Sequence, residues 1–271
     1  MEILGYTASI FIGIALSLTG GGGSILTVPV LVYLMKVQPI HATAYSLFIV
    51  GVSSLVGTIP KIKQKLISYK AAVVFGIPSI VAVFVTRYLI VPSIPEIIIK
   101  TEKIMLTKNN FLMLLFAILM VLTSISMIKD KPCIDCDDTR EPKFNYGLIV
   151  VEGSFVGILT GLVGAGGGFL IIPALVLLSK LSFKKAVGTS LIIITAKSLI
   201  GFTGDVFQTD VDWFLLCTVS LASVLGIFVG NLLTKKIKSD HLKVSFGWFI
   251  FIFGIFIFFK ELLFQILGTN I

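Results

Sequence analysis

Charged side chains are scarce in this chain: they make up 13% of its 271 residues, whereas hydrophobic residues make up 56%. An average soluble domain is about 25% charged, so a water-solvated globular protein is excluded. We expect lipid to solvate the apolar excess, which makes the bilayer a partner of the chain. Basic residues outnumber acidic ones by 22 to 14. They lie in short loops between apolar runs, which indicates orientation in a membrane and not binding to nucleic acid.

Residues typical of catalytic and metal sites are also few. The chain has three cysteines and two histidines, and it contains no HExxH sequence, no aspartate-rich metal motif and no Ser-His-Asp spacing. Three cysteines, one of them inside an apolar run, do not make a disulfide framework. We therefore expect a protein that is not an enzyme and that has no cofactor and no bound metal.

Two of the apolar runs are too long to be single membrane crossings. About 20 helical residues cross a hydrocarbon core of roughly 30 Å. Residues 3–35 and 146–179 are longer, and each contains a glycine-rich cluster, at 20–23 and 164–168. Because each glycine destabilises a helix by roughly 1 kcal/mol relative to alanine, we expect the helix to stop there. The other runs lie at about 42–59, 71–91, 111–128, 186–203, 213–233 and 244–267.

The two broken runs belong to an internal repeat. Residues 13–58 align without a gap with residues 157–202, at an offset of 144, and about 19 of the 46 aligned positions are identical. The matches include glycines and a proline, which shared hydrophobicity does not explain: Gly13/Gly157, Gly20/Gly164, Pro29/Pro173, Ser46/Ser190 and Gly57/Gly201. We predict two transmembrane repeats, residues 1–128 and 146–271, joined by a cytoplasmic linker at 129–145.

The distribution of Lys and Arg favours one way of threading the broken runs. If each run crosses once, the two sides of the membrane carry 9 and 11 basic residues; if each run enters and returns as a hairpin with its glycines at the tip, they carry 15 and 5. The positive-inside rule favours the hairpins. This predicts an all-α polytopic membrane protein with both termini outside. It would consist of two inverted repeats, each a Gly-tipped broken-helix hairpin followed by three transmembrane helices.

The hairpin tips are the candidate binding site. The first N–H groups of a helix lack partners and carry partial positive charge, so two tips that meet near the midplane would bind an anion. An alternative interpretation is that the glycines only allow close packing of helices. The candidate residues are Gly21, Gly22, Gly23, Ser24, Gly166, Gly167 and Gly168.

Lys197 lies in the middle of an apolar run, at the position that matches Ser53 in the first repeat. A lysine at that depth costs about 2.5 to 3.5 kcal/mol, so we predict that it attracts the anion. The alternatives are an ion pair with Glu152 and snorkelling to the membrane surface. Snorkelling is also the explanation that we expect for Arg87, which lies near the end of its run.

Hydroxyl groups on the helices after the hairpins could donate hydrogen bonds to the oxygens of an oxyanion. Ser46 and Ser190 occupy matching positions in the two repeats, and Thr189 precedes Ser190. In membrane helices such hydroxyls often bond to other helices or permit close packing instead, so both interpretations stay open.

Cys133 and Cys136 form a C-x-x-C pair in the predicted linker. One pair supplies only two of the four ligands of a structural zinc site. A sulfur-relay role is the functional alternative, and a solvated linker is the interpretation that we favour.

The paired motifs resemble a known family. Each glycine cluster precedes Pro29 or Pro173 by five or six residues and is followed by Ala42-x2-Tyr45-Ser46-Leu47 or Ala186-x-Gly188-Thr189-Ser190-Leu191. This double motif resembles the TauE/SafE sulfite exporter family, also called the toluene sulfonate uptake permease family, over nearly the whole chain. The resemblance implies a carrier in the cytoplasmic membrane that moves a sulfur-containing oxyanion such as sulfite, thiosulfate or an organosulfonate.

We therefore expect a secondary transporter whose small anionic substrate binds near the midplane, between the two glycine-rich tips. The alternatives are a membrane-embedded sulfur-relay protein that uses Cys133 and Cys136, and a passive anion channel. Glu152 is the one candidate acid for a proton relay, so proton coupling stays open. The individual anion, the direction of transport and the oligomeric state also stay open.

Overall fold

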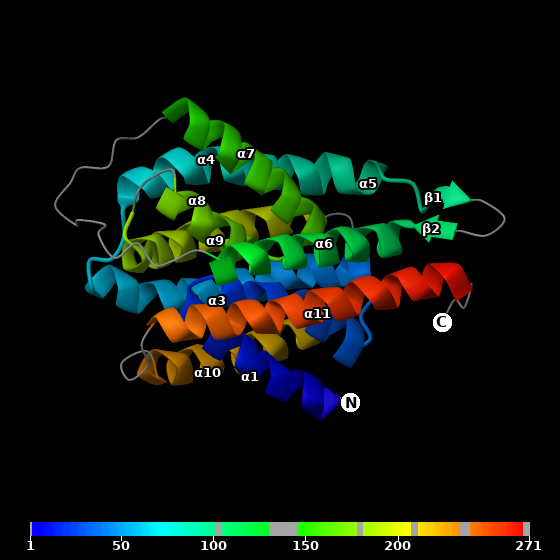
Figure 1. Ribbon diagram of the computed structural model, residues 1–271, viewed down its shortest axis with the longest axis horizontal. Coiled ribbons are helices and arrows are strands. Elements are labelled where there is room, and N and C mark those ends of the chain that lie inside the picture. Colours follow the sequence, from blue (N-terminus) through cyan, green and yellow to red (C-terminus); the bar gives the residue numbers. More distant parts are fainter. Residues whose placement is uncertain are drawn as a thin grey trace.

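The protein is described by a computed structural model that covers residues 2–100, 105–129, 146–177, 181–206, 211–233 and 239–267. This described part is almost entirely helical, and its long helices run side by side along the long axis of the molecule (Figure 1). Five helices are long and apolar enough to cross a membrane: Pro39–Lys63, Tyr69–Ser93, Lys108–Ile125, Lys184–Val206 and Trp213–Leu233. The prediction of an all-α membrane protein is confirmed in its helical content and in the presence of helices that could cross a membrane.

The elements fall into two groups on either side of the predicted linker. The first group is α1 (Glu2–Thr19), η1 (Gly22–Leu26), α2 (Thr27–Pro29), η2 (Val30–Leu34), α3 (Pro39–Lys63), α4 (Tyr69–Val85), η3 (Thr86–Ile90), α5 (Val91–Ser93), β1 (Ile97–Lys100), β2 (Met105–Thr107) and α6 (Lys108–Lys129). The second group is α7 (Tyr146–Val163), α8 (Gly168–Leu177), α9 (Phe183–Val206), α10 (Trp213–Leu233) and α11 (Ser239–Leu267). Of the short segments, η1 is a 3-10 helix, and η2 and η3 are π-helical.

One element departs from the predicted all-helical architecture. β1 and β2 pair as antiparallel strands, with Ile97 opposite Thr107 and Lys100 opposite Met105. Consecutive isoleucines favour extended backbone because their branched side chains pack well on a pleated surface. The hairpin lies toward the same end of the molecule as both termini, whereas the connection between α3 and α4 lies at the opposite end (Figure 1).

Both glycine-rich clusters interrupt their helices, as predicted. α1 ends at Thr19 and α7 ends at Val163, and the residues that follow, Gly20 and Gly164, share a positive φ of 72°. A residue with a Cβ would pay about 1 to 2 kcal/mol in this conformation, so glycine is the residue that fits. Beyond the first break, η1 and η2 pack beside α1.

The helices on the two sides of the linker pack in a reciprocal pattern. α1 packs on α10, and α7 packs on α4. A Cβ on Gly13 would meet the carbonyl oxygen of Ser223, and a Cβ on Gly157 would lie 2.6 Å from the carbonyl oxygen of Ser79. Ser79 and Ser223 are separated by the same offset of 144 as the two glycines, so the two close contacts join positions that match at the repeat offset. Between these pairs, α3 packs on α9, and α6 packs on α11 (Figure 1).

Candidate functional site

The two glycine-rich tips touch each other. A Cβ on Gly21 would lie 2.6 Å from the Cα atom of Gly168, so the two backbones pack with no side chain between them. In the second tip, Gly166 and Gly167 have positive φ angles of 63° and 72°. α8 begins at Gly168, so its first amides and the positive end of its dipole lie where the tips meet.

The remaining predicted residues of the first tip hold its backbone together. The Ser24 hydroxyl donates a hydrogen bond to the carbonyl oxygen of Gly21 at 2.6 Å, and the Ser24 backbone N–H donates to the same oxygen at 3.2 Å. Gly23 packs against α1, because a Cβ on it would lie 2.8 Å from the carbonyl carbon of Ala15. Gly22 is the first residue of η1. In this arrangement the Ser24 hydroxyl stabilises the turn itself.

Lys197 reaches the second tip from α9. Its side chain is fully buried, and Nζ donates a hydrogen bond to Oγ1 of Thr160 at 3.0 Å. Nζ lies 2.5 Å from the point that a Cβ on Gly167 would occupy, so the ammonium fills the space left by the missing side chain. Within the described ranges no carboxylate pairs with it. Snorkelling and the ion pair with Glu152 are therefore both wrong as explanations of Lys197.

No carboxylate of the described residues lies within ion-pair distance of the Lys197 ammonium. A buried ion without a partner costs several kcal/mol, because it has lost its hydration and gained no counter-charge. The nearby start of α8 adds partial positive charge, which raises that cost. An anion bound at this tip would supply the missing counter-charge and would also interact favourably with the start of α8, so it would lower both costs.

Arg87 is a second buried cation at the same tip, and sequence reasoning missed its place there. It lies in η3 and is 1% exposed, so the predicted snorkelling is wrong. Its Nη1 atom lies 3.4 Å from Oδ2 of Asp205 and donates a hydrogen bond to Oγ1 of Thr43 at 3.1 Å. Nη2 lies 2.5 Å from the point that a Cβ on Gly164 would occupy. The available sequence signal is Asp205, an acid just beyond the end of another apolar run.

The predicted hydroxyl residues lie in different environments. The Ser190 hydroxyl donates to the carbonyl oxygen of Gly20 at 2.9 Å and so binds the first tip. Its repeat counterpart Ser46 is fully buried, and its hydroxyl has no hydrogen-bond partner in the described part of the chain. The Thr189 hydroxyl accepts a hydrogen bond from the backbone N–H of Ser68 at 2.9 Å. The Thr189 hydroxyl therefore binds the connection between α3 and α4 and does not contact the tips.

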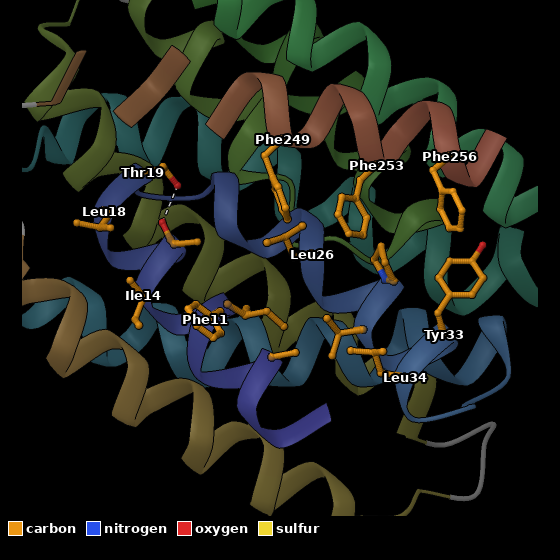
Figure 2. Close-up of a pocket in the computed structure, with 15 residues that line it drawn as sticks. Phe11, Ile14, Leu18, Thr19, Leu26, Tyr33, Leu34, Phe249, Phe253 and Phe256 are labelled. Atoms are coloured by element: carbon orange, nitrogen blue, oxygen red, sulfur yellow. Dashed lines mark hydrogen bonds between the residues drawn. The ribbon is translucent and has the colours of Figure 1, made fainter. Parts of the chain in front are cut away.

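A cavity of about 650 Å³ lies apart from these cations, between α1, the segment from η1 to η2, and α11 (Figure 2). The rings of Phe249, Phe253 and Phe256 extend into it from α11, opposite Tyr33 (Figure 2). The Tyr33 hydroxyl is already engaged, since it donates to Oε1 of Glu261 at 2.9 Å. Apolar walls of this kind do not fit an oxyanion, which needs hydrogen-bond donors.

Comparisons with known proteins find relatives along almost the whole chain. The model of a family described as sulfite exporter TauE/SafE matches residues 6–257. A probable membrane transporter protein of Methanocaldococcus jannaschii is 28% identical over 259 residues, which cover 90% of this chain and 91% of the relative. A probable membrane transporter protein of Xylella fastidiosa is 27% identical over 257 residues, which cover 92% of each chain. The Bacillus subtilis protein YunE, with the same description, is 27% identical over 249 residues, or 82% of this chain and 85% of the relative. No solved structure matches.

Proposed function

The chain belongs to the sulfite exporter TauE/SafE family and is a multi-pass membrane transporter, not an enzyme, and on this premise we propose that it is a secondary transporter of a small sulfur-containing anion. The candidate substrates are sulfite, thiosulfate and organosulfonates, carried across the cytoplasmic membrane. The observation that carries the proposal is the buried Lys197 ammonium, which has no carboxylate partner in the described ranges and lies against the second glycine-rich tip.

The proposed site lies near the midplane, where the two tips meet. Lys197 supplies the charge, the amides at Gly166 and Gly168 supply hydrogen-bond donors, and residues 21–24 form the facing wall. The Gly167 N–H already donates to the carbonyl oxygen of Ala165 at 2.7 Å, so the part of Gly167 is to leave the space that the ammonium fills. The unpartnered hydroxyl of Ser46 is available as a further donor. Thr189 is left out of the site because its hydroxyl is engaged at the α3–α4 connection.

The proposed architecture places this site between two inverted repeats, residues 1–128 and 146–271, joined by the linker at 129–145. Two observations support it: the packing of α1 on α10 is reciprocated by that of α7 on α4, and both termini lie toward the end opposite the α3–α4 connection (Figure 1). The distribution of Lys and Arg supports an orientation with both termini outside. Rocking of one repeat against the other would expose the site to each side in turn.

Flux through the purified protein in liposomes tests the proposed function. We expect sulfur-35-labelled sulfite, thiosulfate or methanesulfonate to move faster than in protein-free liposomes, with a rate that saturates with concentration because each anion occupies a binding site. A rate that rises linearly without saturation would instead identify a passive anion channel. Equal rates with and without protein for all three anions would overturn the proposal.

Replacing both cysteines of the C-x-x-C pair tests the sulfur-relay alternative. Cys133 and Cys136 lie outside the described residues. We expect the double variant Cys133→Ser/Cys136→Ser to keep the wild-type flux, because no cysteine takes part in the proposed site. A double variant that is properly inserted but loses transport would favour the sulfur relay.

A further inference from the structure

Two buried cations flank one glycine turn. The guanidinium of Arg87 approaches Gly164, and the ammonium of Lys197 approaches Gly167, each at 2.5 Å from the point that a Cβ would occupy. Arg87 lies in η3 and Lys197 in α9, so two different elements bring positive charge to the same turn, residues 164–167. The described charged groups here, including Asp205 beside Arg87, sum to a single positive charge.

The Arg87 guanidinium still has donors to offer. Its Nε and Nη2 atoms are buried and have no hydrogen-bond partner in the described part of the chain, whereas Nη1 contacts both Asp205 and Thr43. Buried donors of a charged group are normally satisfied, because leaving them unpaired costs more than a hydrogen bond gains. Arg87 also lies in a π-helical segment, a distortion that is frequent at functional sites.

Among the described residues, no Lys or Arg side chain approaches the glycines of the first tip as Arg87 and Lys197 approach those of the second. At the repeat offset of 144, the counterpart of Arg87 is Asn231 and that of Lys197 is Ser53. Asn231 accepts a hydrogen bond from the Ser17 hydroxyl at 2.8 Å. The positive charge is thus a property of the second tip, which a purely structural role in both repeats does not explain.

We propose that Arg87 is a second anion-binding residue of the transport site, whose Nε and Nη2 donate to substrate oxygens while Asp205 cancels its charge. The inference deepens the proposed function and rests on it. Lys197 then supplies the single uncompensated charge, and the hydroxyls of Ser46 and Ser198, which lack partners in the described part of the chain, add neutral donors. Such a site takes a singly charged sulfonate-type oxyanion in preference to a divalent one.

Three oxygens on one sulfur suit this arrangement. A planar guanidinium presents its donors as a fork that matches two oxygens of an oxyanion, and an ammonium acts as a point charge on the third. A structural role for the Arg87–Asp205 pair, tying η3 to α9, accounts for Nη1 alone. It leaves Nε and Nη2, which have no partner in the described part of the chain, without a function, although Nη2 lies beside Gly164.

Removing the counter-charge tests the inference. Asp205→Asn raises the net positive charge at the turn by one, so we expect the ratio of thiosulfate to methanesulfonate transport to rise about tenfold, because a divalent anion gains more from the extra charge. The double variant Arg87→Gln/Asp205→Asn restores the original net charge and is expected to return the ratio to its wild-type value. Lys63→Ala, at an exposed residue, is the control and leaves the ratio unchanged.

A second variant covers the case in which Asp205→Asn does not fold. Arg87→Lys keeps the charge beside Asp205 but removes the planar fork, so we expect KM for methanesulfonate to rise about tenfold with the thiosulfate ratio unchanged. A wild-type KM in Arg87→Lys, or an unchanged ratio in a folded Asp205→Asn variant, would overturn the inference. If either result is found while the wild type transports anions and needs Lys197 to do so, only the role of Arg87 is contradicted. If the wild type transports none of the anions, the proposed function itself is contradicted.

Discussion

Replacing Lys197 by methionine is expected to lower anion transport by about 30-fold or more. Truncating one member of a buried, hydrogen-bonded charge pair costs about 2 to 5 kcal/mol, and every 1.4 kcal/mol is about tenfold in affinity. The same substitution should leave the free energy of unfolding unchanged or raise it when no anion is present. The reason is that methionine replaces a buried ammonium that has no carboxylate partner among the described residues with an apolar group of similar length.

Initial rates in liposomes and thermal unfolding in anion-free detergent measure the two effects. Lys63→Met is the matched control, because Lys63 is an exposed lysine in the last turn of α3. A loss of both transport and stability in Lys197→Met would identify a structural lysine. Wild-type rates in Lys197→Met would remove the residue from the site altogether.

Adding one methyl group at Gly167 is expected to produce the second large effect. With φ at 72°, an alanine there pays about 1 to 2 kcal/mol of backbone strain. Its Cβ would also clash with the Thr160 side chain and with Nζ of Lys197, and overpacking adds about 1 to 3 kcal/mol. We expect Gly167→Ala to lower the thermal unfolding midpoint and, in the folded fraction, to lower transport more than tenfold because it displaces the ammonium.

Gly57→Ala is the matched control for that variant. Gly57 is a buried glycine inside α3, and a Cβ there would meet its nearest neighbours at 3.8 to 3.9 Å, which is ordinary contact. Alanine is also the better helix former by about 1 kcal/mol. Wild-type transport with unchanged or raised stability is therefore expected. Equal behaviour of Gly57→Ala and Gly167→Ala would show that the turn does not depend on the absence of a side chain.

The breaks in the two long apolar runs could be predicted because their causes are local. Clusters of glycine end a helix wherever they occur, and α1 and α7 end beside Gly20 and Gly164. Burial of Lys197 could be predicted for a similar reason, since a charge in the middle of an apolar run has little access to water. The β1–β2 hairpin was missed because hydropathy alone does not distinguish a short run of isoleucines in a strand from the end of a helix.

The partners of the buried charges could not be predicted in this way. Glu152 is the one acid in the adjoining broken run, yet Lys197 donates to Thr160. Arg87 lies close enough to the end of its run to reach the membrane surface, yet its guanidinium turns inward to Asp205 and Thr43. Sequence position gives the depth of a residue in a membrane helix, but the direction of its side chain depends on which helices pack around it.

By itself the sequence determined the membrane environment, the duplication and the two glycine breaks, because composition, repeat identity and helix propensity act on each segment without regard to the others. Only the tertiary structure decided that Gly21 and Gly168 touch, and that Arg87 and Lys197 approach one turn from η3 and α9. These contacts join residues far apart in the chain. They exist because glycines let α1 pack closely on α10 and α7 on α4, a fit between surfaces that no single segment encodes.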